Sequence, residues 1–177
     1  MTIAPNFFDM DAAPMRIAAV RLKVRDLDAV STFYQTVLGL SPISSGEGRV
    51  SLGTGYTPLL HLDGDPGLAP RDQGQAGLFH VAFLMSRPDL ARWLRHVAEA
   101  RVPLQGASDH IVSEALYLAD PEGNGIEVYS DRPPARWSDA EGDIQMATDP
   151  LDFDDLMRAA GDARWSGFPA DGSIGHV

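Results

Sequence analysis

The feature that most constrains the fold of this 177-residue chain is an internal repeat. Each copy has a stretch of alternating apolar side chains, then apolar residues at helical spacing, and then shorter alternating stretches. Val20 in the first copy corresponds to Val81 in the second, and Phe33 corresponds to Trp93. The sequence therefore predicts an α+β fold that contains two copies of a strand, a helix and three strands.

The first copy covers residues 15–63. Residues 18–24 alternate between apolar and polar side chains, which predicts a strand. Residues 28–38 carry apolar side chains at helical spacing, and Asp26 or Asp28 is the expected N-cap of this helix. The remaining elements predicted for this copy are a C′ glycine, a turn and two strands, at Gly39, residues 44–48, residues 49–53 and residues 58–62.

The second copy covers residues 77–130 and is predicted to begin with a strand at residues 78–85. Ser86 is the expected cap of the helix that follows, with Pro88 in its first turn. Alternation along the strand sorts its side chains onto two faces. We expect the face toward the helix to carry Phe79, Val81 and Phe83, and the opposite face to carry His80, Ala82 and Leu84.

Three further segments flank or join the copies. Residues 1–14 are predicted to be a loose leader, and because no basic residue precedes an apolar core there, we expect no signal peptide. Residues 64–76 are rich in Gly, Asp and Pro and predict a linker. Residues 131–177 predict a second linker with a short helix at residues 152–160, after which Ile-Gly-His-Val matches the start of a further module.

Residues 108–130 carry the most informative pattern, two strands joined by a turn. The turn is Asp-Pro-Glu-Gly-Asn-Gly, a combination of residues typical of tight turns. In the second strand Glu127 points away from Ile126 and Val128, because side chains alternate across a strand. A single glutamate in this position is more often part of a solvated strand face than of a site.

The order of residues in this stretch resembles the motif of extradiol ring-cleavage dioxygenases. The matching positions are His110, Leu116, Tyr117, Asp120, Pro121, Gly123 and Glu127, and Ser108 departs from the small or branched residue usual at its position. In that family the glutamate is an iron ligand, and the histidine and tyrosine hydrogen-bond the substrate and oxygen. The resemblance therefore implies a metal ligand at Glu127 and catalytic roles for His110 and Tyr117.

The repeated unit resembles the βαβββ module of the vicinal oxygen chelate superfamily, which includes glyoxalase I, bleomycin-resistance proteins and extradiol dioxygenases. The resemblance covers residues 15–130 and implies two βαβββ modules that form a curved mixed sheet with a central cleft. Residues 131–172 resemble the linker of two-domain catechol 2,3-dioxygenases. The chain is thus most similar to the N-terminal half of such an enzyme, and His176 would be the first metal ligand of a following domain.

In this superfamily four equivalent strand positions converge on one metal. Here those positions are Ala19, His61, His80 and Glu127, since the interval from Thr54 to His61 equals the interval from Asp120 to Glu127. Ala19 cannot bind a metal. The predicted ligands are therefore His80, Glu127 and His61, two imidazoles and one carboxylate, which is the donor set of mononuclear Fe(II) sites. Mn(II), another divalent metal or no metal are the alternatives, and His61 can equally be an ordinary, partly buried histidine.

Composition limits the partners of the chain. Its formal net charge of −11 should repel nucleic acid and anionic membranes. The absence of cysteine excludes disulfides and thiolate chemistry, and no apolar run in the sequence is long enough to span a bilayer. With 44% hydrophobic residues the chain can bury a core. We expect a cytoplasmic protein that forms a homo-oligomer such as a dimer.

The resulting hypothesis is an extradiol oxidoreductase of aromatic catabolism, which cleaves a small catechol-type substrate with O₂. A metal-free N-terminal or small-molecule-binding domain of the same superfamily is the first alternative, because Ala19 replaces a ligand. A glyoxalase-type isomerase is the second, because His61 stands where such enzymes have a carboxylate.

Overall fold

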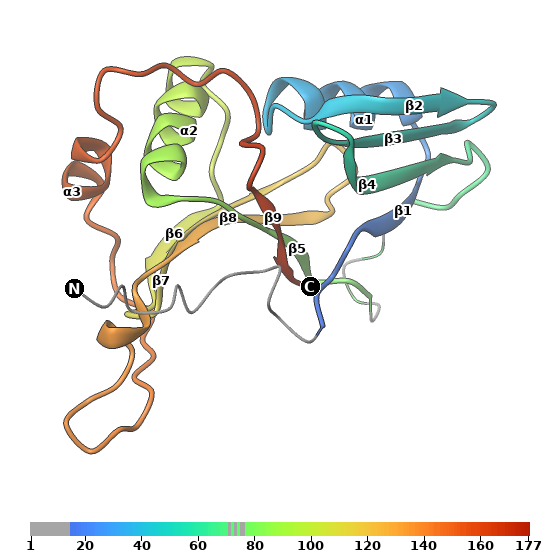
Figure 1. Ribbon diagram of the computed structural model, residues 1–177. Coiled ribbons are helices and arrows are strands. Elements are labelled where there is room, and N and C mark those ends of the chain that lie inside the picture. Colours follow the sequence, from blue (N-terminus) through green and yellow to red (C-terminus); the bar gives the residue numbers. More distant parts are fainter. Residues whose placement is uncertain (1–14, 71, 73, 75–76) are drawn as a thin grey trace.

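The computed structural model describes residues 15–70, 72, 74 and 77–177 (Figure 1). The predicted leader, residues 1–14, lies outside the described residues. No helix in the described part of the chain is long and apolar enough to cross a membrane. In chain order the elements are β1 Val20–Val24, α1 Leu27–Thr36, β2 Ser41–Gly46, β3 Arg49–Thr54, β4 Thr57–Gly64, β5 His80–Leu84, α2 Arg87–Glu99, β6 Gly106–Asp109, β7 Ser113–Ala119, β8 Gly125–Asp131, a 3-10 turn Pro134–Arg136, α3 Phe153–Arg158 and β9 Ser173–His176.

The strands form two sheets, one from each predicted copy, with β9 added to the second (Figure 1). The strand order is β1-β4-β3-β2 in one sheet and β6-β7-β8-β5-β9 in the other. The pairs β1–β4 and β5–β8 are parallel, and the remaining pairs are antiparallel. The α+β class and the two βαβββ units are confirmed. An isolated antiparallel bridge joins Ile17 to Ile174.

Both main helices are capped by predicted residues, although α1 begins at Leu27, one residue before its predicted start, and ends at Thr36, two residues before its predicted end. The Asp26 carboxylate accepts a hydrogen bond from the Ala29 backbone N–H at 2.9 Å and caps α1. The Ser86 hydroxyl accepts one from the Asp89 N–H at 3.3 Å and caps α2. Beyond the end of α1, Gly39 has a φ of 72°, the left-handed conformation expected of a glycine after a helix.

Two local predictions were wrong. Residues 44–48 were expected to form a turn, but β2 continues through Gly46. This strand lies at a sheet edge with nearly all its side chains exposed, so it has no apolar alternation to reveal it. Phe79 was expected to face the helix, but it precedes β5 and its side chain is 80% exposed, whereas Val81 and Phe83 are fully buried.

The two modules pack against each other within one chain. Trp93 on α2 is fully buried, and its indole N–H donates a hydrogen bond to the backbone carbonyl of Val37, just after α1, at 2.8 Å. The turn between β7 and β8 provides a second link, because the Glu122 carboxylate accepts hydrogen bonds from the backbone N–H groups of Arg25 and Asp26, both at 2.7 Å. These contacts fix the position of the β7–β8 hairpin relative to the first module.

A buried ion-pair network fixes the other end of this hairpin. Glu114 on β7 is 2% exposed and binds Arg87, at the start of α2, with distances of 2.5 and 3.0 Å. Arg132, directly after β8, lies 3.2 Å from the same carboxylate. A buried carboxylate needs hydrogen-bonded positive charges of this kind, because removing its charge from water is costly. The hairpin that carries the motif is thus held at both ends.

Candidate metal centre

Sheet register brings three ligand-type side chains together. On β5, Ala82 pairs with Glu127 of β8 on one side and with His176 of β9 on the other. Residues that pair across neighbouring strands project from the same face of the sheet. His80 lies two positions before Ala82 on the same strand and therefore shares that face. One glutamate and two histidines consequently surround the small side chain of Ala82.

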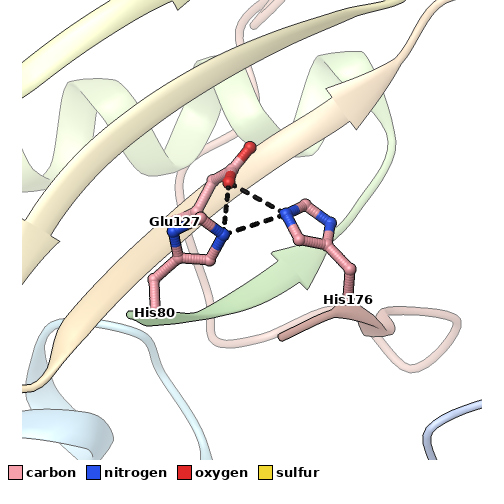
Figure 2. Close-up of side chains that lie close together, drawn as sticks. All are labelled: His80, Glu127 and His176. Atoms are coloured by element: carbon pink, nitrogen blue, oxygen red, sulfur yellow. Dashed lines mark hydrogen bonds and ion pairs between the residues drawn. The ribbon is translucent and has the colours of Figure 1, made fainter. Parts of the chain in front are cut away.

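The three side chains point at one another (Figure 2). The Nε2 atoms of His80 and His176 are 3.0 Å apart, and each lies 3.1 Å from Oε2 of Glu127. The carboxylate is 4% exposed, His80 is partly buried and His176 is the most exposed of the three. The cluster thus combines a buried acid with imidazoles that face solvent on one side.

Burial and the carboxylate act differently on the two imidazoles. Burial lowers the pKa of His80 below its ordinary value, although the charge of Glu127 opposes this shift. The hydrogen bond to Glu127 raises the pKa of His176. In the metal-free cluster the geometry therefore favours a neutral His80 and a His176 that donates its proton to the carboxylate. Metal binding requires an unprotonated Nε2 on both rings, so protonation of His176 at low pH would oppose it.

The donor set fits a divalent transition-metal ion. Two imidazole nitrogens and one carboxylate oxygen lie within 4.8 Å of one another. This is the composition of the two-histidine, one-carboxylate sites that leave coordination positions open for substrates. The Nδ1 atom of His80 is buried and makes no hydrogen bond within the described part of the chain, so no second-shell acceptor holds this ring from the side opposite Nε2.

Tyr117 and His110 form a hydrogen-bonded pair beside the cluster. Tyr117 on β7 pairs in register with Glu127, and its ring centroid lies 6.3 Å from that of His80. His110 Nε2 is 2.8 Å from the Tyr117 hydroxyl, and its Nδ1 is 2.7 Å from the carbonyl of Ala147. Because a carbonyl only accepts, the Nδ1–H must donate to it, and Nε2 of the neutral ring accepts from the tyrosine. Burial, reinforced by Glu127, raises the pKa of Tyr117 to about 12.

A small apolar cluster lies on the same face of the sheet. It consists of Ala82, Ala115 and Tyr129, with Leu84 and Tyr117 packed against it. Tyr129 is two positions after Glu127 on β8, and its ring centroid lies 5.3 Å from that of His176. The candidate metal site is therefore bordered by apolar and aromatic side chains.

Comparison with known families agrees with this architecture. Residues 16–128 match the family model of the Glyoxalase/Bleomycin resistance protein/Dioxygenase superfamily. The chain belongs to this superfamily. Its members are mostly metal-dependent enzymes.

Curated superfamily members differ in what they do. The chain is 37% identical over 165 residues to catechol-2,3-dioxygenase from Bacillus subtilis, an alignment that covers 91% of this chain and 58% of that protein. It is 29% identical over 131 residues to biphenyl-2,3-diol 1,2-dioxygenase 2 from Rhodococcus globerulus, covering 69% and 65%. The metallothiol transferase FosB of Staphylococcus epidermidis is 28% identical over 109 residues, covering 60% and 75%. The chain thus spans less than two thirds of the length of either dioxygenase.

Solved structures support the fold. A glyoxalase/dioxygenase from Nostoc punctiforme superposes with a TM-score of 0.57 at 22% identity, covering 75% of this chain and 97% of that one. Lactoylglutathione lyase from Agrobacterium tumefaciens superposes with a TM-score of 0.52 at 25% identity, covering 66% and 94%.

The predicted site residues are only partly brought together. His80 and Glu127 lie in the cluster, and His110 and Tyr117 lie next to it. His61 is not in this group. It lies on β4 in the other sheet, where its Nδ1 is 2.8 Å from the Ser51 hydroxyl. Because β5 has β8 and β9 as its neighbours, the third ligand-type side chain in the cluster is His176.

His176 was singled out from the sequence but assigned to a different place. The Ile-Gly-His-Val pattern marked it as a ligand-type residue at the start of a strand, yet of a further module. In the structure Ser173–His176 is a strand, β9, but it pairs with β5 of the second module. No local signal in residues 173–177 indicates which strand they pair with.

Proposed function

We propose that this chain is an extradiol-dioxygenase-like enzyme that acts on small catechol-type aromatics with O₂ and one divalent metal ion. The observation that carries the proposal is the convergence of His80, Glu127 and His176 beside the hydrogen-bonded pair of Tyr117 and His110. The 37% identity to the catechol-2,3-dioxygenase of Bacillus subtilis supports the same reaction class.

His80, Glu127 and His176 would hold the metal. A bound Fe(II) ion would supply Lewis acidity and redox chemistry to a catecholate and to O₂. The protein's own contribution is a fixed donor set, in which the buried Glu127 balances positive charge and the partly exposed His176 leaves one side open to solvent. Mn(II) would suit the same donors.

Tyr117 and His110 are placed to handle protons. With its pKa raised to about 12, Tyr117 keeps its hydroxyl proton at neutral pH. This proton is donated to His110 Nε2, so the Tyr117 oxygen is free to accept a hydrogen bond from a substrate hydroxyl. His110 is anchored through Nδ1 to the Ala147 carbonyl, which leaves Nε2 as the atom that accepts a proton. A catechol hydroxyl proton could reach His110 through Tyr117, since the two side chains are hydrogen-bonded.

The apolar cluster beside the site suits a flat, hydrophobic substrate. Tyr117 borders the site from β7, and Tyr129 lies edge-on next to His176. An aromatic ring bound beside these tyrosines could pack against their rings, which favours binding. These side chains give no charge that would select a charged substituent on the ring.

The test is metal binding by Glu127→Gln, which keeps the shape of the side chain and removes its charge. We expect the wild-type chain to bind Mn(II) with one-to-one stoichiometry by anaerobic calorimetry, and the variant to lose about 10-fold or more in affinity. Glu141→Gln, at an exposed loop position, serves as the matched control and should bind like wild type. Oxygen consumption with catechol should require Fe(II) and Glu127. Wild-type metal affinity in folded Glu127→Gln would overturn the proposal.

A second candidate is a glyoxalase-type isomerase, favoured by the similarity to the lactoylglutathione lyase structure. A third is a metal-free domain that binds small molecules. Parallel assays of the Fe(II)-loaded and the metal-free chain with catechol and with a hemithioacetal would separate the candidates, because only the dioxygenase consumes O₂.

A further inference from the structure

The third ligand-type residue comes from outside the two modules. β9 lies between β5 and the segment before β1, paired with β5 through Ala82–His176 and bridged to Ile17 through Ile174 (Figure 1). Ile174 is fully buried in the main core. His80 and Glu127, by contrast, belong to the second module itself. The cluster is therefore complete only when β9 is in place.

Residues 161–176, the docking segment, touch both modules on the way to β9. The backbone N–H of Phe168 donates to the carbonyl of Gly39 at 2.9 Å, and the Thr54 hydroxyl donates to the Phe168 carbonyl at 3.3 Å. The Phe168 ring packs on Phe83 of β5 with ring centroids 5.8 Å apart. Arg95 of α2 binds the backbone carbonyls at the beginning of the segment.

The last residues of the segment fit closely against the site. A Cβ atom on Gly175 would lie 1.8 Å from the hydroxyl oxygen of Tyr129, so only glycine allows this approach. The His176 ring packs edge-on against both His80 and Tyr129, with ring centroids 5.0 and 5.3 Å apart. Its hydrogen bonds within the described residues go to the cluster alone. The side chain of His176 nevertheless stays 47% exposed.

We propose that a divalent metal ion locks the docking segment onto the two modules, with His176 as the coupling ligand. Metal binding and docking are then one linked equilibrium. An ion held by His80, Glu127 and His176 favours the docked segment, and any change that loosens the segment weakens ion binding by the same factor. This inference rests on the metal site of the proposed function, and it adds that the open state of the segment has a weaker, two-residue site.

The first test is hydrogen exchange of the 177-residue chain with and without Mn(II), followed by mass spectrometry. We expect Mn(II) to slow exchange in peptides that cover residues 166–176 about 10-fold or more, and to leave the exposed loop at residues 139–143 nearly unchanged. In His176→Ala, Mn(II) should bind about 10-fold or more weakly and should not slow exchange in those peptides. These magnitudes correspond to typical coupling between two sites.

The second test loosens the segment without touching a ligand. Phe168→Ala removes the contact with Phe83 and should weaken Mn(II) binding on the order of 10-fold. Phe33→Ala is the matched control, since it removes the same ring from a partly buried position on α1. It should bind Mn(II) like wild type. Equal affinities for Phe168→Ala and Phe33→Ala would overturn the coupling.

The failures of the two proposals are distinguishable. If Mn(II) binds through Glu127, but His176→Ala binds it equally well and exchange in residues 166–176 does not respond, the lock is wrong and the metal site remains. If wild type binds no Mn(II), Fe(II) or Zn(II), both proposals fail together.

Discussion

At the scale of single residues, β8 concentrates ionisable groups on the site face. Glu127, Tyr129 and Asp131 alternate along this strand and so project to the same side. Burial raises the pKa of Asp131 to about 6, with His176 opposing the shift and Glu127 adding to it. A second carboxyl group thus lies near the cluster, in a setting that favours its protonated form.

This raised pKa gives stability a defined pH dependence. Because the pKa of Asp131 is higher in the folded chain than its ordinary 3.8, the folded state binds more protons between the two values. The free energy of unfolding should therefore fall as pH rises from about 4 to about 6. Asp131→Asn removes this contribution. Between pH 4 and pH 6 we therefore expect the free energy of unfolding of the variant to rise by about 1 kcal/mol relative to that of wild type, a value reduced for the partial exposure of the Asp131 side chain.

Urea unfolding of the metal-free chain at intervals from pH 4 to pH 7 measures this difference. The exposed Asp171 provides the control variant, Asp171→Asn. If Asp131→Asn and wild type change stability in parallel across the range, the shift assigned to Asp131 is wrong.

At the scale of elements, the contact between the two main helices stabilises the pairing of the modules. Trp93 of α2 fills a fully buried position and reaches the carbonyl group that α1 leaves at its end. Without Trp93, the buried carbonyl of Val37 would have no hydrogen-bond donor, which is costly. Trp93 therefore both fills the core and supplies a hydrogen bond to a backbone carbonyl at the end of α1.

Trp93→Phe keeps an aromatic ring but removes the hydrogen bond and leaves a small cavity. We expect the free energy of unfolding to drop by about 2–3 kcal/mol, from the unpaired carbonyl and the lost packing. Urea denaturation followed by circular dichroism measures the loss. Trp165→Phe, at a partly buried position, is the comparison and should cost less than about 1 kcal/mol. Equal losses in the two variants would contradict the role given to Trp93.

At the scale of the whole molecule, the cluster lies where the second sheet, the docking segment and the first module meet. β9 joins the second sheet, and Ile174 bridges to Ile17 at the beginning of the first module. The docking segment contacts the first module at Gly39 and Thr54. A metal ion in the cluster would thus act on the packing of the chain as a whole.

Metal binding should therefore raise global stability. At a free Mn(II) concentration 100-fold above the dissociation constant, linkage adds about 2.7 kcal/mol to the free energy of unfolding. For a chain of this size that corresponds to a rise in Tm of roughly 5–10 °C. Differential scanning calorimetry with Mn(II), and again after adding a chelator, measures the shift and its reversal. An unchanged Tm in wild type under these conditions would contradict metal binding by the folded state.

Much of the fold was predictable because it depends on short-range physics. Helix capping by Asp26 and Ser86 follows from side chains that bond to backbone groups three residues away. Strand alternation placed His80 and Glu127 on corresponding faces, and register in the structure brings them together. Prediction of secondary structure and burial was wrong where the local pattern was weak, as in the exposed edge strand β2 and at Phe79, just outside β5.

The composition of the cluster was decided only by the tertiary structure. Sequence alone offered His61 and His176 as ligand-type residues, each on a predicted strand, and it could not say which strand would lie next to β5. Pairing between strands depends on contacts far apart in the chain, such as the burial of Ile174 between β5 and Ile17 and the approach of Gly175 to Tyr129. Those contacts place His176 beside Glu127 and leave His61 in the other sheet.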